Sequence, residues 1–272
     1  MSDVSTSVQK AIAHNVCGAP PAKLSKADWK SYAAIKQILQ TEHKLTKENA
    51  ETNGWEVAGE SWQADELGGA WHDWFSLADG SLMIVGGVGG ATGMAGAIEA
   101  ASLRGAARAV AGKVASPAEL VAICSDMMLS HADGRMPGGL YAAQIHDASN
   151  EVILAGAGEV ESLLLLSAAD AASATASPWQ RVVLKAQAAV KNVHARMIRG
   201  VTIEVRRGEL LLVGCISLAA CEALQLGPPC ATGDELHGQS AGRACGRLRS
   251  HFTNDRHGTI TADRSLIVLR RR

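Results

Sequence analysis

Several features that mark common protein classes are scarce or absent in this chain. Aromatic residues are few, with 6 Trp, 2 Tyr and 2 Phe among 272 residues. No apolar run reaches the roughly 20 residues that span a bilayer, so we expect no membrane insertion. Positive charge is not in excess, because 26 Lys and Arg stand against 27 Asp and Glu. Without a dense basic run, and with residues 270–272 interpreted as a solvated tail, the chain is not expected to bind nucleic acid.

Closely spaced cysteine pairs are also missing, although the chain contains six cysteines. Structural zinc sites commonly use such pairs. The alternative here, Cys230 or Cys245 combined with His237 or His251, has irregular spacing. The N-terminal residues do not resemble a secretory signal, and reduced thiols in apolar stretches behave as small hydrophobic groups. We therefore expect a reduced, cytoplasmic setting.

The chain divides by composition into an arm, a helix and one main domain. Residues 1–24 are polar and punctuated by Ala and Pro, which predicts a flexible arm. Residues 25–53 begin with the capping pair Ser25 and Asp28 and carry apolar residues near helical spacing, so an amphipathic helix is expected. It either packs on its own domain or binds a partner or a second copy. The candidate partner-binding residues are Tyr32, Ile35 and Leu39.

Residues 54–272 contain no repeat or obvious linker and are predicted to form one domain. Short strands joined by tight turns outnumber the helices, which favours antiparallel sheets with helices outside. The helices are expected at 94–113, 117–129 and 240–252. The strands are expected at 55–61, 71–77, 82–85, 140–146, 152–155, 163–166, 201–205, 210–213 and 265–269. Four tryptophans, Trp55, Trp62, Trp71 and Trp74, crowd the early strands, where core packing is the default interpretation and an exposed partner-binding patch is the alternative.

Residues 82–96 read as a strand, a glycine-rich turn and a helix, which resembles a phosphate-binding turn. The spacing of Gly90, Gly93 and Gly96 is compatible with a dinucleotide site, but no second parallel strand with a ribose-binding residue follows. A P-loop is excluded because no Gly-Lys-Ser/Thr follows the glycines. The G-x-S-x-G match at 238–242 lacks the buried strand that should precede Ser240.

Six stretches occur in the order found in a known family. They are 35–39 with 54–58, ELGGAWHDWF at 66–75, GGVGG at 86–90, LAGAGE at 154–159, LLVGCIS at 211–217 and ADRSLIVL at 262–269. They resemble the metal-dependent type 2C Ser/Thr protein phosphatases, particularly the SpoIIE/RsbU-type branch, over about residues 30–272. The resemblance implies an α+β fold in which two packed antiparallel β-sheets are flanked by helices, an αββα sandwich.

The same resemblance exposes four missing ligands. Ala70, Gly87, Ile216 and Ala262 stand where the family has aspartates that hold Mg or Mn. Hard divalent cations need oxygen ligands, which none of these side chains provides. The resemblance therefore implies a domain without a cofactor and without catalytic residues, a pseudophosphatase. The alternative is an active Mn- or Mg-dependent protein serine/threonine phosphatase with an altered metal site.

A vestigial pocket is predicted around the lost ligands. Its members are Glu66, Asp73, Gly86, Gly87, Val88 and Asp263. Asp73 and Asp263 keep secondary acid positions of the family, where they either hydrogen-bond to turns or hold one residual cation. The backbone amides of the glycine turn either pack tightly or bind an anion. His72 and Asp73 are not expected to pair, because neighbours on a strand point to opposite faces.

The predicted function is protein binding, scaffolding or regulation. The SpoIIE/RsbU-type resemblance implies partners such as STAS-domain antagonists, anti-sigma kinases or a larger complex. Self-association through residues 25–45 would give a homodimer instead.

Overall fold

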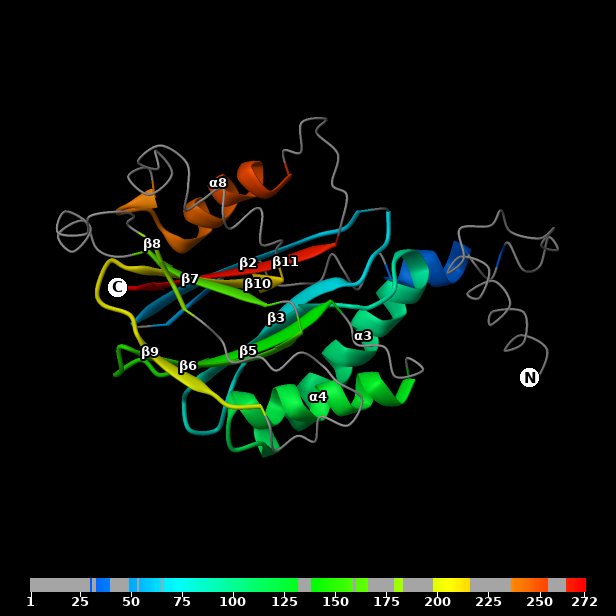
Figure 1. The fold of residues 1–272 in the computed structure, drawn as a ribbon, viewed down its shortest axis with the longest axis horizontal. Helices are drawn as coiled ribbons and strands as arrows, with labels where there is room; N and C mark the ends of the chain where they lie inside the picture. The colour runs from blue at the N-terminus through cyan, green and yellow to red at the C-terminus, as the bar shows by residue number, and fades with distance from the viewer. Residues whose placement is uncertain are drawn as a thin grey trace.

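The computed structural model describes residues 30, 33–39, 49–52, 54–64, 66–131, 138–158, 160–165, 179–182, 198–215, 236–253 and 263–272. They form two antiparallel sheets packed face to face, with helices on both outer faces (Figure 1). The predicted sandwich is therefore confirmed. No helix in these ranges is long and apolar enough to cross a membrane.

The first sheet has six strands and brings the two ends of the domain together. Its order is β1 (Asn49–Glu51), β2 (Trp55–Trp62), β11 (Arg264–Arg271), β10 (Leu210–Cys215), β7 (Glu161–Leu165) and β8 (Trp179–Arg181). The long register between β2 and β11, from Trp55–Arg271 to Trp62–Arg264, places the last strand beside one of the first. Because β1 pairs with β2, the helix predicted over 25–53 does not extend to its expected end: this segment finds its hydrogen bonds in the sheet.

The second sheet has five strands in the order β3 (Ala70–Ser76), β4 (Leu82–Val88), β5 (Gly139–Ile145), β6 (Glu151–Gly158) and β9 (Val201–Glu204). The β3–β4 turn follows from its sequence. Asp79 Oδ1 accepts hydrogen bonds from the backbone N and Oγ of Ser81, which lower the pKa of Asp79. Gly80 takes a positive φ of 81°, which suits glycine.

Helices cover both outer faces (Figure 1). The second sheet carries α3 (Gly93–Val110), the short 3₁₀ helix η1 (Ala111–Lys113) and α4 (Pro117–His131), while α8 (Ala241–Thr253) covers the first sheet. A further helix occupies residues 33–39.

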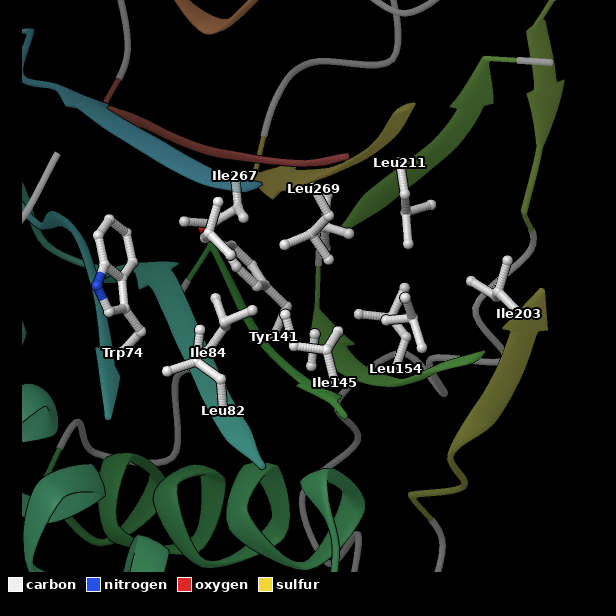
Figure 2. Close-up of a cluster of buried hydrophobic side chains, with 14 of the residues drawn as sticks. Trp74, Leu82, Ile84, Tyr141, Ile145, Leu154, Ile203, Leu211, Ile267 and Leu269 are labelled. Atoms are coloured by element: carbon white, nitrogen blue, oxygen red, sulfur yellow. The ribbon is translucent and has the colours of Figure 1, made fainter. Parts of the chain in front are cut away.

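The main core lies between the sheets, where alternate side chains of both meet. Figure 2 shows Leu211, Ile267 and Leu269 of the first sheet above Ile84 and Leu154 of the second. The four early tryptophans are at most 3% exposed, so the packing interpretation is confirmed over the surface patch.

Candidate functional site

One corner of the sandwich gathers several of the predicted pocket residues. It forms where β3 begins, β4 ends and β11 begins. Ala70 pairs with Val88 in the sheet, and both are buried in the core between the sheets. Asp263 immediately precedes β11, and its two carboxylate oxygens accept hydrogen bonds from the backbone N of Ala64 at 2.8 Å and of Gly69 at 2.5 Å. Asp263 thus fixes the turn that leads into Ala70.

Gln63 closes the same corner from the β2 side. Its Nε2 donates to the carbonyl O of Ala70 at 2.7 Å, and its Oε1 accepts from the backbone N of Ala70 at 3.2 Å. The side-chain amide of Gln63 therefore bonds both backbone groups of Ala70, as a neighbouring strand would at the start of β3. Gly68 lets these groups approach, because a Cβ there would lie 2.2 Å from Gln63 Oε1 and 2.4 Å from Asp263 Oδ1.

The amides of the glycine turn are bonded within the chain. Gly89 N donates to the carbonyl O of Gly69 at 2.9 Å. Gly90 N and Ala91 N donate to Glu99 Oε2 of α3 at 3.0 and 3.2 Å. These three donors would have to leave existing partners to bind an anion, so the described geometry favours the tightly packed turn over the anion site.

Gly86 and Gly87 lie in contact with β5. A Cβ on Gly86 would lie 2.4 Å from Tyr141 Oη, and one on Gly87 would lie 2.5 Å from the carbonyl O of Gly139. The carbonyl O of Gly139 is a backbone atom, so it cannot rotate away from an added Cβ on Gly87 as a side chain could. Position 87 also lies on the face of β4 that carries Met83 and Val85 toward the helices, whereas Ala70 faces the other sheet.

Asp73 does not join Asp263 at the corner. It is 1% exposed and lies on the helix side of β3, where its carboxylate forms ion pairs with Arg108 and, at 3.6 Å, with Arg104 of α3. It also accepts a hydrogen bond from Trp74 N at 2.9 Å. Alternation along β3 explains this placement, because residues 70 and 73 are separated by an odd number of positions.

His72 points toward the other sheet, so it does not pair with Asp73, as alternation predicts. Its ring Nδ1 lies 2.8 Å from Ser61 Oγ, and the ring stacks on Trp74. Nearby, Ser265 Oγ donates to the carbonyl O of Trp71 at 2.8 Å and lies 2.8 Å from Tyr141 Oη. We call Ser61, His72, Tyr141 and Ser265 the inter-sheet polar cluster.

The helix at 33–39 lies against the corner's outer turn. Ile35 and Leu39 pack, partly buried, on a small cluster of Leu67, Met94 and Ala97, and Lys36 forms an ion pair with the otherwise exposed Glu66. Ile38 of the same helix is 63% exposed.

Three predicted residues, Tyr32, Ile216 and Ala262, lie outside the described ranges. Sequence reasoning missed Gln63 and Glu99. Their partners lie 7 and 9 residues away along the chain, and a lone polar residue near a glycine turn carries no signal that it will fold back onto it.

The described corner does not fit a two-metal centre. Among the described residues, no three His, Cys, Asp or Glu side chains gather closely enough to hold a metal ion. Both oxygens of Asp263 already accept backbone hydrogen bonds, and Ala70 and Gly87 have no side-chain ligand. A pair of hard cations needs several shared carboxylate oxygens.

Comparison with known proteins finds similarity in fold but none in sequence families. No protein-family model and no curated protein matches the sequence. Solved structures do match, among them type 2C (PP2C) phosphatase domains. The fold is that of type 2C phosphatases.

Three of these structures illustrate the similarity in fold. The RsbU and RsbW domains of Rv1364c from Mycobacterium tuberculosis align with a TM-score of 0.64 at 18% identity, over 80% of this chain and 60% of that one. The SiaA-PP2C domain of Pseudomonas aeruginosa aligns at 0.62 and 13%, over 91% and 99%. The phosphatase domain of SpoIIE from Bacillus subtilis, with a fragment of its regulatory domain, aligns at 0.60 and 11%, over 82% and 64%. The chain thus spans less than two thirds of the first and third structures.

Proposed function

We propose that this chain is a catalytically inactive type 2C, SpoIIE-type phosphatase-like domain that serves as a protein-binding, scaffolding or regulatory subunit. One observation carries the proposal: at the corner where the fold's relatives would hold metal, Ala70 replaces an acid and Asp263 is bonded to the backbone of Ala64 and Gly69. In the sequence, Ile216 and Ala262 stand where the family resemblance places two further aspartates.

The chemistry supports inactivity, because phosphate-ester hydrolysis is extremely slow without a catalyst. Hydrolysis of a phosphate monoester needs up to about 10²¹-fold acceleration. In a two-metal site the cations ionise the attacking water and stabilise the developing charge. No described side chain at this corner replaces either contribution, since Asp263 and Glu99 are engaged with backbone amides and Glu66 forms an ion pair with Lys36.

A protein partner is the proposed ligand of the domain. The similar structures include RsbU and RsbW domains within one chain and a domain of the bacterial stressosome, matched with a TM-score of 0.52 at 13% identity. On this analogy we propose STAS-domain or anti-sigma-type regulators as the partner class, with a homodimer as the other outcome. A cytoplasmic site of action belongs to the same proposal, which the free, buried thiols of Cys124 and Cys245 support.

A phosphatase assay tests the loss of activity. The purified chain is incubated with excess Mn²⁺ or Mg²⁺ and either para-nitrophenyl phosphate or a phosphoserine peptide, beside an active type 2C phosphatase. We expect no turnover above the metal blank and no saturable Mn²⁺ binding in calorimetry. Turnover that Asp263→Asn abolishes would refute the proposal and establish the altered-site enzyme.

A pull-down from the source cell tests the binding role. The intact chain and a form lacking residues 25–45 are used as baits, and recovered proteins are identified by mass spectrometry. Specific recovery of a regulator by the intact chain supports the proposal. Recovery of no protein, together with a monomeric mass in light scattering, would contradict it.

A further inference from the structure

Arg264, the first residue of β11, is the only buried lysine or arginine among the described side chains. It is 8% exposed and pairs in register with Trp62 of β2. Alternation along β11 places it on the same face as Leu266 and Val268, which pack beneath α8, and opposite Ser265 of the inter-sheet polar cluster. The fold therefore covers a positive charge on the α8 side of the first sheet.

The acids beside Arg264 are engaged elsewhere. Asp263, which precedes it in the chain, accepts hydrogen bonds from the backbone amides of Ala64 and Gly69. Glu60 lies on the same face of the neighbouring strand β2, but its Oε1 forms an ion pair with Arg249 at 2.8 Å. Within the described part of the chain, no hydrogen bond and no ion pair joins the Arg264 guanidinium to another residue. The charge thus lacks a counter-ion among these residues.

The chemistry of a guanidinium makes this placement costly. The group stays charged throughout the pH range in which proteins fold, so it cannot relieve its burial by losing a proton as an amine can. A charge held away from water without a partner is unfavourable. None of the Arg264 nitrogens is among the described atoms that are both fully buried and without a hydrogen-bond partner. Since they have no such partner, part of the remaining exposed surface belongs to the guanidinium, and an ion can reach it from solvent.

We propose that Arg264 binds a small oxyanion, a phosphate or a carboxylate, which supplies the counter-ion that the described residues do not. The planar fork of guanidinium N–H groups matches two oxygens of such an ion. Because only a small part of the residue is exposed, a free anion fits it better than a helix or a membrane, whose charges lie on a broad face. The site is separate from the glycine turn, and the inference depends neither on the proposed binding role nor on the loss of catalysis.

Melting temperatures of the full chain in matched salts test the site. Potassium phosphate, acetate and chloride are compared at one neutral pH and one ionic strength, so that general screening is the same in all three. We expect phosphate or acetate to raise the melting temperature in a saturable way beyond chloride, and Arg264→Gln to abolish this gain. The matched control is Arg243→Gln, which removes an exposed arginine of α8 and should keep the full gain.

Line broadening of inorganic phosphate in ³¹P NMR measures binding directly. Arg264→Gln should raise the dissociation constant for phosphate at least about tenfold, because it removes a charge-assisted bidentate contact. Arg264→Lys keeps the charge but not the fork, and it should bind more weakly than the unaltered chain and more tightly than the Gln variant.

Arg264→Met separates anion binding from packing, because it keeps an unbranched stem and removes the charge. In chloride its melting temperature should equal or exceed that of the unaltered chain, which carries the unpaired charge. In saturating phosphate or acetate the unaltered chain should gain and the Met variant should not.

Two results would overturn the proposal. One is an unaltered chain that responds to phosphate and acetate no more than to chloride. The other is an equal loss of melting temperature in Arg264→Met in all three salts, which would show that the guanidinium has a partner within the chain. The phosphatase assay is read independently: turnover would refute the inactive domain and leave the anion site standing, whereas a missing salt response without turnover would do the reverse.

Discussion

At the scale of single residues, Gly87 is held by the backbone of the neighbouring strand. A Cβ at this position would lie 2.5 Å from the carbonyl O of Gly139 and 3.2 Å from Leu140 Cα. The position at which the family resemblance expects the central metal ligand is therefore one at which β4 and β5 tolerate no side chain. The same contact would oppose restoring the metal ligand by a Gly87→Asp substitution.

Gly87→Ala should lower the free energy of unfolding by about 1–3 kcal/mol, because the added methyl forces β4 and β5 apart. Denaturant titration measures this effect. The control, Gly105→Ala, fills open space on α3 and should raise stability by about 0.5–1 kcal/mol. Equal gains from both substitutions would mean that β5 does not press on position 87.

Asp263→Ala should lower the free energy of unfolding by about 1–3 kcal/mol, because it leaves two amides of the 63–69 turn without their acceptor. Glu66→Ala, on the same turn, removes only an exposed ion pair and should change stability by about 0–1 kcal/mol. Both are measured by denaturant titration with and without Mn²⁺. A Mn²⁺-dependent gain in stability that Asp263→Ala abolishes would contradict the structural role.

At the scale of elements, Asp73 ties β3 to α3. Its nearly buried carboxylate is shared by Arg108, which is half exposed, and Arg104, which is mostly buried. Because α3 also carries Glu99, which holds the glycine turn, Asp73 anchors the same helix that positions this turn. Asp73 is thus a structural anchor at a distance from Asp263.

Asp73→Ala should lower the free energy of unfolding by about 3–5 kcal/mol, because it removes the buried carboxylate that faces the largely buried Arg104. A double-mutant cycle with Arg104→Ala should return a favourable coupling of about 1–3 kcal/mol. If the chain proves to be an enzyme and Asp73→Asn removes turnover without loss of stability, the anchor interpretation fails.

The sequence predicted elements well where the signal is local. The strands expected at 71–77 and 82–85, and at 140–146 and 152–155, form the β3–β4 and β5–β6 hairpins, and the helix expected from residue 117 begins there as α4. Strand β1 was missed because three residues carry almost no pattern and depend on pairing with β2. The grouping of Asp73 with Asp263 fails for a related reason: sequence order places motifs along the chain, but strand alternation and helix packing decide which way a side chain faces.

At the scale of the whole molecule, the two sheets are joined by more than apolar packing. The inter-sheet polar cluster connects β2 with β3 through a partly buried hydrogen bond, and β11 with both β3 and β5 through buried ones. Burial raises the pKa of Tyr141 above its ordinary value of 10.0. Burial also raises the pKa of Cys124, beneath α4, to about 11 and that of Cys245, beneath α8, to about 12. Burial therefore favours the neutral form of a titratable group beneath α4, between the sheets and beneath α8.

These groups predict that stability falls in alkaline solution. The thiols ionise near pH 9.0 when unfolded but only near pH 11 for Cys124 when folded, so the folded state binds more protons in between. Stability is then fully present below about pH 9 and declines as pH rises toward 11, by up to about 1.4 kcal/mol per pH unit for each such group. Denaturant titrations from neutral pH to pH 11 measure this slope. Cys124→Ala costs stability at neutral pH because it leaves a small cavity, but it removes one titrating group, so its deficit should shrink as pH rises. A deficit that stays constant across that range would show that the Cys124 thiolate is tolerated in the folded core.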